Sequence, residues 1–467
     1  MRPLTAIFIL LLFFCGKTPP PANPKSYAED FRILVTSLRE LDPMAYKVMN
    51  RDTFDAHAKS TEERLLTAKS RNEAIYMMQE FMYDLGDSHA TIASSYGNLS
   101  VNRILPFKIF ILNNKIYVRS YERDTSLNGE EIFSIDGVPA KTIIDSLKIF
   151  YPNDGRRDII GFGLPALFNS LYAAFCHEAD TFHIMTSKGG FNLASVRKDE
   201  APFGNLVAYS WLGYTNADPT YCKQVNEDYG YFRFTDFAKE EDGHTIEDEF
   251  SQLITDLNSR GIKNLVIDLR YNSGGDPYIA GRMATHFTTR PLQIFQRLIL
   301  TSTRRVTYAS YMVRNFAYRF RLAGTRVRGD HREKVKHERG LQEYNPSPNH
   351  FDGTVYVITG SMTGSAATML CRYLQDLPNV HFVGTETEGG TNYFCAHKHC
   401  ELTLPNNGIY VTFGMQLVEL EKGSSDSQKP HGIIPAHSPA YIIDDLMRAR
   451  DLELEWIRND IAEKKQE

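Results

Sequence analysis

The sequence is poor in the features that identify several large classes of protein. Its formal net charge is -5 over 467 residues, so it lacks the basic excess typical of proteins that bind nucleic acids. It has six cysteines but no pair of Cys-x2-Cys motifs, which excludes the usual zinc-finger patterns. What remains, with 42% hydrophobic and 23% charged residues, is a globular protein able to bury a sizeable core. At ~150 residues per domain, the length predicts more than one domain.

The N-terminus has an apolar run too short to cross a membrane. Ala6 to Cys15 is apolar throughout, whereas a spanning helix needs ~20 such residues. A basic residue, Arg2, precedes the run, and a proline-rich stretch follows it. This pattern predicts an export signal over residues 1–16 and a linker over 17–27, and hence a location in the periplasm, cell envelope or extracellular space. Cys15 ends the run where a lipoprotein carries its modified cysteine, so a membrane tether is left open.

Without Cys15, five cysteines remain, which is an odd number. At least one of them is therefore expected to stay free or to pair between chains. Cys371 lies on the apolar face of a predicted helix and is expected to be a small core residue. The segment CAHKHC, from Cys395 to Cys400, suits either a metal ion or a tight disulfide loop. The export signal favours the disulfide, since exported proteins fold in oxidising compartments.

The first half of the chain changes its hydrophobic period near residue 100. Residues 28–100 carry apolar side chains every three or four positions, as in NEAIYMMQEFMYDLG, which predicts a helical region. Residues 101–212 change to strand-like segments, with tight turns expected at Asn113-Asn114 and Asp136-Gly137. We therefore expect helices followed by a β-rich region.

Residues 213–457 alternate apolar strands with amphipathic helices. The segment IKNLVIDLR is almost continuously apolar, as strands are in a sheet covered on both faces. This alternation predicts a mostly parallel sheet and a multi-domain α/β fold. Residues 296–350 interrupt it and are basic and rich in tyrosine and phenylalanine. We expect an insertion or lid with solvated charges there, rather than a nucleic-acid-binding segment, and a charged tail over 458–467.

Two Gly/Ser turns follow two of the predicted strands. One contains Gly274 and Gly275, and the other leads to Ser365 at the start of a predicted helix. The carboxyl ends of parallel strands meet at one edge of the sheet, so the two turns are expected to lie together. A serine hydroxyl near backbone N–H groups, such as that of Ala366, suits acyl transfer through an oxyanion. Most serines at such positions only cap the helix, so the residues alone favour a capping role for Ser365.

A nucleophilic serine needs a base, and the sequence alone does not select one. His89 lies in GDSHATI, in a turn between a predicted helix and a predicted strand. Histidines in turns are usually just solvated, so this position is only a candidate.

Four segments in order resemble the tail-specific, or C-terminal processing, protease family, which includes the tricorn core protease and the modules of interphotoreceptor retinoid-binding protein. They are NLVIDLRYNSGGD, GTVYVITGSMTGSAATML, VHFVGTETEGGT and HGIIP, and the similarity covers roughly residues 228–455. The resemblance implies a crotonase- or ClpP-like catalytic domain with Ser365 as nucleophile. It also implies an oxyanion hole from Ala366, Gly274 and Gly275. LPFKIF and GEEIFSIDG resemble the PDZ-like module of such proteases.

The sequence departs from parts of this family pattern. Members of the Ser/Lys type carry a lysine in the segment similar to VGTETEGGT, where this chain has Gly390. SHA resembles the tricorn branch instead, which implies His89 as the base with Ser88 beside it. That branch has a glutamate shortly before the segment similar to GIIP. Here a lysine stands at the nearest match, which leaves Glu421 or Glu419 from the preceding strand.

The resemblance implies an exported serine peptidase that hydrolyses peptides or unfolded or C-terminal protein segments. No metal, nucleotide or other cofactor is expected, and the oligomeric state is left open. The alternative is a catalytically inactive member of the family that binds a peptide or a lipid. A hydrolase acting on another ester or amide is a third possibility.

Overall fold

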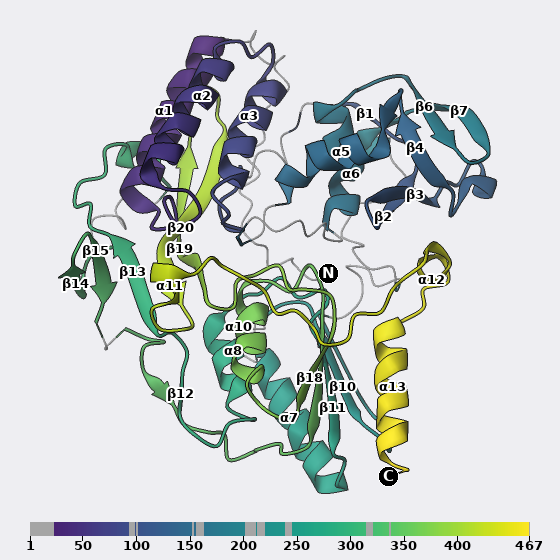
Figure 1. Cartoon of the computed structure of the whole chain (residues 1–467), viewed down its shortest axis with the longest axis vertical. Helices are drawn as coiled ribbons and strands as arrows, with labels where there is room; N and C mark the ends of the chain where they lie inside the picture. The colour runs from purple at the N-terminus through teal and green to yellow at the C-terminus, as the bar shows by residue number, and fades with distance from the viewer. Residues whose placement is uncertain are drawn as a thin grey trace, which may run out of the picture.

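The computed structural model describes residues 23–92, 99, 101–151, 154–155, 163–200, 212, 220–238, 245–313, 321–335 and 338–466. They form a multi-domain α/β protein with an N-terminal group of helices, a β-rich region and a larger β/α part (Figure 1). The predicted export signal, Cys15 and most of the predicted linker lie outside the described residues. None of the described helices combines the length and apolar character that a bilayer crossing needs.

The N-terminal helices pack around a cluster of aromatic rings. They are α1 (Pro24–Leu41), α2 (Arg51–Leu65) and α3 (Arg71–Tyr83). Phe81 meets Phe31 and Phe54 edge to face, with ring centroids 5.1 and 5.3 Å apart. Helix α1 begins within the predicted linker, because Pro24 suits the first turn of a helix. After α3 the chain joins the C-terminal part through an antiparallel bridge between Thr91 and Thr412.

The β-rich region is built around one mainly antiparallel sheet. Its strand order is β2-β3-β4-β6-β7, with β5 paired to β4, while β1 pairs separately with β8. Asn113 and Asn114 have φ of 51° and 59°, and Asp136 has 50°, which confirms both predicted turns. The likeness to a PDZ module stays a prediction. The strands are β1 (Arg103–Ile104), β2 (Lys108–Leu112), β3 (Lys115–Ser120), β4 (Glu131–Ile135), β5 (Val138–Pro139), β6 (Thr181–Thr186), β7 (Gly189–Ala194) and β8 (Val196–Arg197), and the helices are α5 (Ala140–Leu147), α6 (Gly163–Phe175) and the short 3-10 turns η1 (Thr125–Leu127), η2 (Lys148–Phe150) and η3 (Lys198–Glu200).

The C-terminal part contains the predicted parallel sheet, in the order β18-β17-β11-β10-β9. All pairs are parallel except β9 with β10. Helices α7, α8 and α10 cover one face and α13 the other, so β11 is apolar on both sides as predicted (Figure 1). Helix α13 includes most of the predicted charged tail. The elements are β9 (Tyr221–Val225), β10 (Gly230–Phe234), α7 (Ile246–Arg260), β11 (Asn264–Asp268), α8 (Pro277–Ala284), β17 (Thr354–Thr359), α10 (Ser365–Leu374), β18 (Val380–Gly384), α12 (Ile443–Met447) and α13 (Leu452–Lys464).

A second sheet joins the C-terminal part to the N-terminal helices, in the order β14-β15-β13-β20-β19. Three of its strands come from the segment predicted as an insertion, 296–350. Strand β13 is held to β20 by its ladder and by the ion pair between Arg297 and Glu419, so this segment is not all solvated. The elements are β12 (Leu292–Gln293), β13 (Arg297–Thr301), η4 (Ala309–Tyr311), β14 (Thr325–Arg328), β15 (His331–Lys334), β16 (Glu343–Tyr344), β19 (Tyr393–Thr403), β20 (Tyr410–Glu419) and α11 (Ser424–Ser427).

The disulfide favoured for CAHKHC is wrong. Cys395 and Cys400 are both free and fully buried on strand β19. They lie five positions apart on an extended strand, which corresponds to roughly 16 Å, far beyond the ~6 Å between the Cα atoms of a disulfide. Each thiol packs into a different apolar cluster. Cys371 is a buried core residue, as predicted.

Candidate active site

Ser365 is the first residue of α10, after a turn that follows strand β17. The residue that caps the helix is Gly364, and no side chain accepts a capping hydrogen bond there. The expectation that Ser365 caps the helix is therefore wrong. Because no cap holds the hydroxyl, Ser365 Oγ is left for other chemistry.

The backbone of Ser365 has an unusual conformation. Its φ is +46°, in the left-handed region that residues with a side chain seldom adopt. Holding a residue there costs about 1–3 kcal/mol, and such strain gathers at functional sites. A strand, a sharp turn with a strained serine and a helix also make up the nucleophile elbow of serine hydrolases. The local geometry thus favours a nucleophile over a simple surface serine.

The glycine turn after β11 lies against the start of α10. A Cβ added to Gly274, whose φ is +117°, would lie 2.6 Å from Ser365 Cβ and 3.0 Å from Ala366 N. The two predicted Gly/Ser turns therefore meet. Gly274 N–H donates to Asn272 Oδ1 at 2.9 Å, whereas Gly275 N–H has no partner among the described residues. Gly275 and Ala366 are the better-placed candidates for donating to an oxyanion.

His89 is held by its neighbours in the loop after α3. Its Nδ1 lies 3.2 Å from Ser88 Oγ and 3.7 Å from Asp87 Oδ1. Its ring stacks on Phe394 of β19, and its side chain is only 16% exposed. Both polar partners are at Nδ1, so a proton there leaves the lone pair on Nε2. That is the arrangement a general base needs.

Three carboxylates set the charge around His89. Burial of the ring alone would lower the pKa of His89. The hydrogen bond and charge of Asp87, with the charges of Asp154 and Glu388, outweigh burial and raise that pKa above 6.5. Asp87, His89 and Asp154 bring one polar atom each to within 4.8 Å of one another. None of these three acids was predicted from the sequence. Only Asp87, two residues before His89, lies close enough to His89 in the chain to have been a candidate.

Residues 388–390 connect the surroundings of Ser365 to those of His89. Glu388 Oε2 would lie 3.4 Å from a Cβ on Gly364, next to Ser365. Two residues later, Gly390 N–H donates to Asp154 Oδ2 at 2.7 Å. Asp154 Oδ1 in turn accepts the Ser88 N–H at 2.9 Å. Residues 388–390 thus lie near both Ser365 and His89, although no hydrogen bond joins these two side chains within the described part of the chain.

The acids named from the sequence lie elsewhere. Glu419 is fully buried, and Arg297 binds both its oxygens at 2.5 and 2.7 Å, so it belongs to a structural ion pair. Glu421 is exposed, just past the end of β20. The strongest charges acting on His89 are instead those of Asp87, Asp154 and Glu388.

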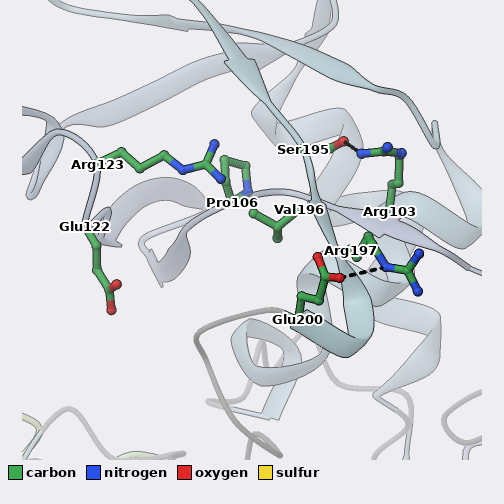
Figure 2. Close-up of a pocket in the computed structure, with 8 residues that line it drawn as sticks. All are labelled: Arg103, Pro106, Glu122, Arg123, Ser195, Val196, Arg197 and Glu200. Carbon is green, nitrogen blue, oxygen red and sulfur yellow. Dashed lines mark hydrogen bonds and ion pairs between the residues drawn. The ribbon is translucent and has the colours of Figure 1, made fainter.

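A pocket of about 440 Å³ lies in the β-rich region, away from Ser365 (Figure 2). Arg103, Arg123 and Arg197 line it, together with Glu122 and Glu200. Arg103 already pairs with Asp180 and donates to Ser195, and Arg197 pairs with Glu200 and Asp199. Two of its three arginines are thus already paired with carboxylates, and its lining residues include no nucleophile–base pair.

Comparisons with known proteins concern the family and the fold of the chain. Residues 228–436 match the family model of Peptidase family S41. Mature CPAF complexed with lactacystin has a similar structure, with a TM-score of 0.64 at 16% identity over 95% of this chain and 98% of that one. A crystal structure of mature CPAF gives 0.62 at 14% identity over 94% and 96%. At these identities the likeness concerns the fold. No curated protein matches the sequence.

Proposed function

We propose, since residues 228–436 belong to peptidase family S41, that Ser365 and His89 carry out peptide-bond hydrolysis by a Ser-His mechanism. The family makes the chain a serine-type peptidase. The observation that carries the mechanism is the meeting of a strained, uncapped Ser365 with the glycine turn at Gly274. Residues 388–390 lie near both the start of α10 and the surroundings of His89, whose pKa is raised.

The proposed reaction has two halves. His89 Nε2 removes the proton from Ser365 Oγ, which attacks the peptide carbonyl carbon. The oxygen of the tetrahedral intermediate accepts hydrogen bonds from Ala366 N–H and from the Gly274-Gly275 turn. His89 then gives its proton to the leaving amine. Water, activated by His89 in turn, releases the acyl group and restores the Ser365 hydroxyl.

In this scheme Asp87 is the carboxylate that supports His89. Its Oδ1 faces His89 Nδ1 at 3.7 Å and also accepts the His89 backbone N–H at 2.9 Å. A fixed carboxylate there stabilises the imidazolium and keeps the proton on Nδ1. Ser88 Oγ supports the same tautomer from the other side. We assign no catalytic part to Glu421.

We propose peptides and unfolded or C-terminal protein segments as substrates. In the β-rich sheet, β2 and β7 are the edge strands, and an extended peptide would add to such an edge through backbone hydrogen bonds. Titration of a fluorescent peptide into the Ser365→Ala variant tests this binding without turnover. Deletion of residues 181–194, which form β6 and β7, would weaken it if β7 is the edge used.

Export is a further part of the proposal, supported by Arg2, the apolar run and the proline-rich stretch. Mass spectrometry of the protein from its native cells would then find an N-terminus at or after residue 15. A diacylglycerol-modified Cys15 would add the membrane tether. An intact Met1 terminus in the mature protein would contradict export.

Digestion of casein, read by mass spectrometry, tests the function. Purified protein without residues 1–22 is compared with its Ser365→Ala variant, after circular dichroism has shown that both are folded. We expect cleavage by the unmodified protein alone. Equal cleavage by both would indicate a contaminating protease. No cleavage by either would favour a binding protein on the same fold.

A further inference from the structure

Two carboxyl groups are buried together behind His89. Asp42 follows helix α1, and Asp87 lies in the loop after α3; their exposed fractions are 2% and 0%. One oxygen of Asp42, one of Asp87 and Cys395 Sγ lie within 4.8 Å of one another. The described residues supply no lysine or arginine that contacts either acid. The proposed peptidase mechanism uses Asp87 but assigns no part to Asp42 or Cys395.

The hydrogen bonds differ between the two oxygens of each acid. Asp42 Oδ1 accepts the Met44 N–H at 2.7 Å and faces Cys395 Sγ at 3.7 Å. Asp87 Oδ1 accepts the His89 N–H. The Oδ2 atoms of both acids are buried and have no partner among the described residues. Leaving two buried oxygens unpaired is costly, and a proton between them would satisfy both.

Two buried carboxylates this close cannot both stay ionised without a cation. His89 supports the charge of Asp87 and not that of Asp42, because its Nδ1 faces Asp87. The uncompensated acid is therefore Asp42. Burial, and then the charge of Asp87, raise the pKa of Asp42 well above its usual range.

We infer that Asp42 is a neutral carboxylic acid that carries its proton on Oδ2 and offers it to Asp87 Oδ2. Asp42 is thus a positioning residue: it keeps Asp87 ionised and oriented toward His89. Its effect on catalysis rests on the proposed function, whereas its protonation state does not.

Among the groups that the structure describes around the cluster, none supplies the missing cation. Asp154 and Glu388 add negative charge from two different loops. On β19, burial raises the pKa of the Cys395 thiol, which keeps it neutral. The centroid of the His399 ring, also on β19, lies 5.7 Å from that of the His89 ring. A proton on Asp42 is therefore the simplest neutralisation of the pair.

The Asp42→Asn variant tests the charge of Asp42. An asparagine amide keeps the acceptor for Met44 N–H and replaces the O–H donor by an N–H donor. We expect kcat/KM on a peptide substrate within about twofold of wild type, and an unshifted acid limb of its pH profile. If Asp42 were ionised, the substitution would remove a negative charge near His89. The acid limb would then move to lower pH, and the inference would be wrong.

The Asp42→Leu variant is the matched comparison for the positioning role. Leucine has a similar volume but no donor, so Asp87 Oδ2 loses its partner and Asp87 takes up a proton more readily. We expect kcat to fall about tenfold or more with little change in KM, while Asp42→Asn keeps its kcat. Equal kcat values for the two variants would rule out this role.

Thermal unfolding tests the protonation without any activity, in a Ser365→Ala background. Because the pKa of Asp42 is raised in the folded protein, Asp42 keeps its proton there, whereas the unfolded chain releases that proton above about pH 4. The contribution of Asp42 to the free energy of unfolding therefore falls as pH rises. Asp42→Asn removes that loss, and its Tm should rise relative to the parent from pH 5 to pH 8. A difference that stays constant or shrinks would overturn the inference. So would a stoichiometric divalent metal in the purified protein, since a cation would let both acids ionise.

Discussion

At Ser365 the chain holds a side-chain-bearing residue in a backbone conformation that glycine normally occupies. The neighbouring Gly364 occupies the N-cap position, so the Ser365 hydroxyl does not cap the helix. A purely structural turn would place glycine at the left-handed position and avoid the strain. The placement of serine there is the residue-level reason to expect chemistry.

Single substitutions at the nucleophile and the base should remove turnover. Ser365→Ala and His89→Ala are each expected to lower kcat by roughly 10⁴-fold or more, since the residues act as one unit. The double variant should be no worse than either single one. Steady-state rates on a fluorogenic peptide check this, with melting curves as the control for folding. Full activity of His89→Ala would show that another group is the base.

The close approach of Gly274 to the nucleophile gives a sharper steric test. In Gly274→Ala the added Cβ would meet Ser365 Cβ at 2.6 Å, so the nucleophile must move. We expect kcat/KM to fall by roughly 10²-fold, as for a misplacement of about 1 Å. Gly137→Ala is the matched control: it also has positive φ, but open space surrounds its Cβ. It should lose only ~1–2 kcal/mol of stability and no activity.

The pH profile should report the acids around His89. Because the pKa of His89 is raised above 6.5, the acid limb of kcat/KM should lie above that pH. Glu388→Gln removes one negative charge and should move the limb to lower pH. Glu386→Gln is the control, because Glu386 is not among the strongest charges on His89. A larger shift in the control than in Glu388→Gln would contradict the assigned electrostatics.

At this scale motifs and a family resemblance mark Ser365, His89 and the glycine turn in the sequence. The structure confirms that the two Gly/Ser turns meet, and the catalytic roles stay predictions. Asp154 and Glu388 could not be found that way. They act on His89 from loops 65 and 299 positions further along the chain, and only the folded structure brings them there. Glu419 was a plausible acid by position, but its partner Arg297 was invisible in the sequence.

Among the elements, helix α13 holds the strand that leads to the glycine turn. Arg270, just after β11, is fully buried and bonded to Asp268 at 2.6 Å and to Asp451 at 2.8 Å. It also reaches Glu453 in the first turn of α13, at 3.1 Å. Asn272, Gly274 and Gly275 follow directly. This network fixes the base of the turn that lies against Ser365.

Breaking this network should destabilise the protein strongly. Arg270→Met leaves Asp268 and Glu453 buried without their cation, at an expected cost of about 3–5 kcal/mol in the free energy of unfolding. Denaturant titration measures the change. The exposed pair of Lys465 with Asp228 is the control, and Asp228→Asn should have little or no effect. A similar loss in both variants would argue against a special role for Arg270.

Elements with strong local signals were predicted correctly: the parallel strands, their helices and the asparagine turn at Asn113-Asn114. The second sheet was not, because β13 and β20 are distant in sequence and pair only through tertiary contacts. The predicted disulfide between Cys395 and Cys400 was wrong for a similar reason. Their spacing suits a disulfide loop only if the chain between them bends, and here it is a strand.

For the molecule as a whole, the candidate site depends on contacts between distant parts of the chain. His89 belongs to the N-terminal part and Ser365 to the C-terminal part, and the bridge between Thr91 and Thr412 links them. Asp42 and Cys395 belong to the same junction. The domain boundaries predicted from the sequence place His89 and Ser365 in different domains. The sequence therefore pointed to these two residues separately, but not to the acids around His89.

The free cysteines give a prediction about the whole fold. The five described cysteines are unpaired, and three of them are fully buried. A reductant should therefore leave Tm unchanged. Iodoacetamide should spare Cys371, Cys395 and Cys400 in the native protein, and label all five in guanidinium without reduction. Thiols that become reactive only after reduction would contradict this, and peptide mapping would identify them.

The central claim is that Ser365 is a nucleophile activated by His89. The most direct measurement is labelling with a fluorophosphonate, followed by peptide mapping of wild type, Ser365→Ala and His89→Ala. We expect one adduct, on Ser365 of wild type, with labelling greatly slowed in His89→Ala. An adduct on another serine, or undiminished labelling of Ser365 without His89, would contradict it.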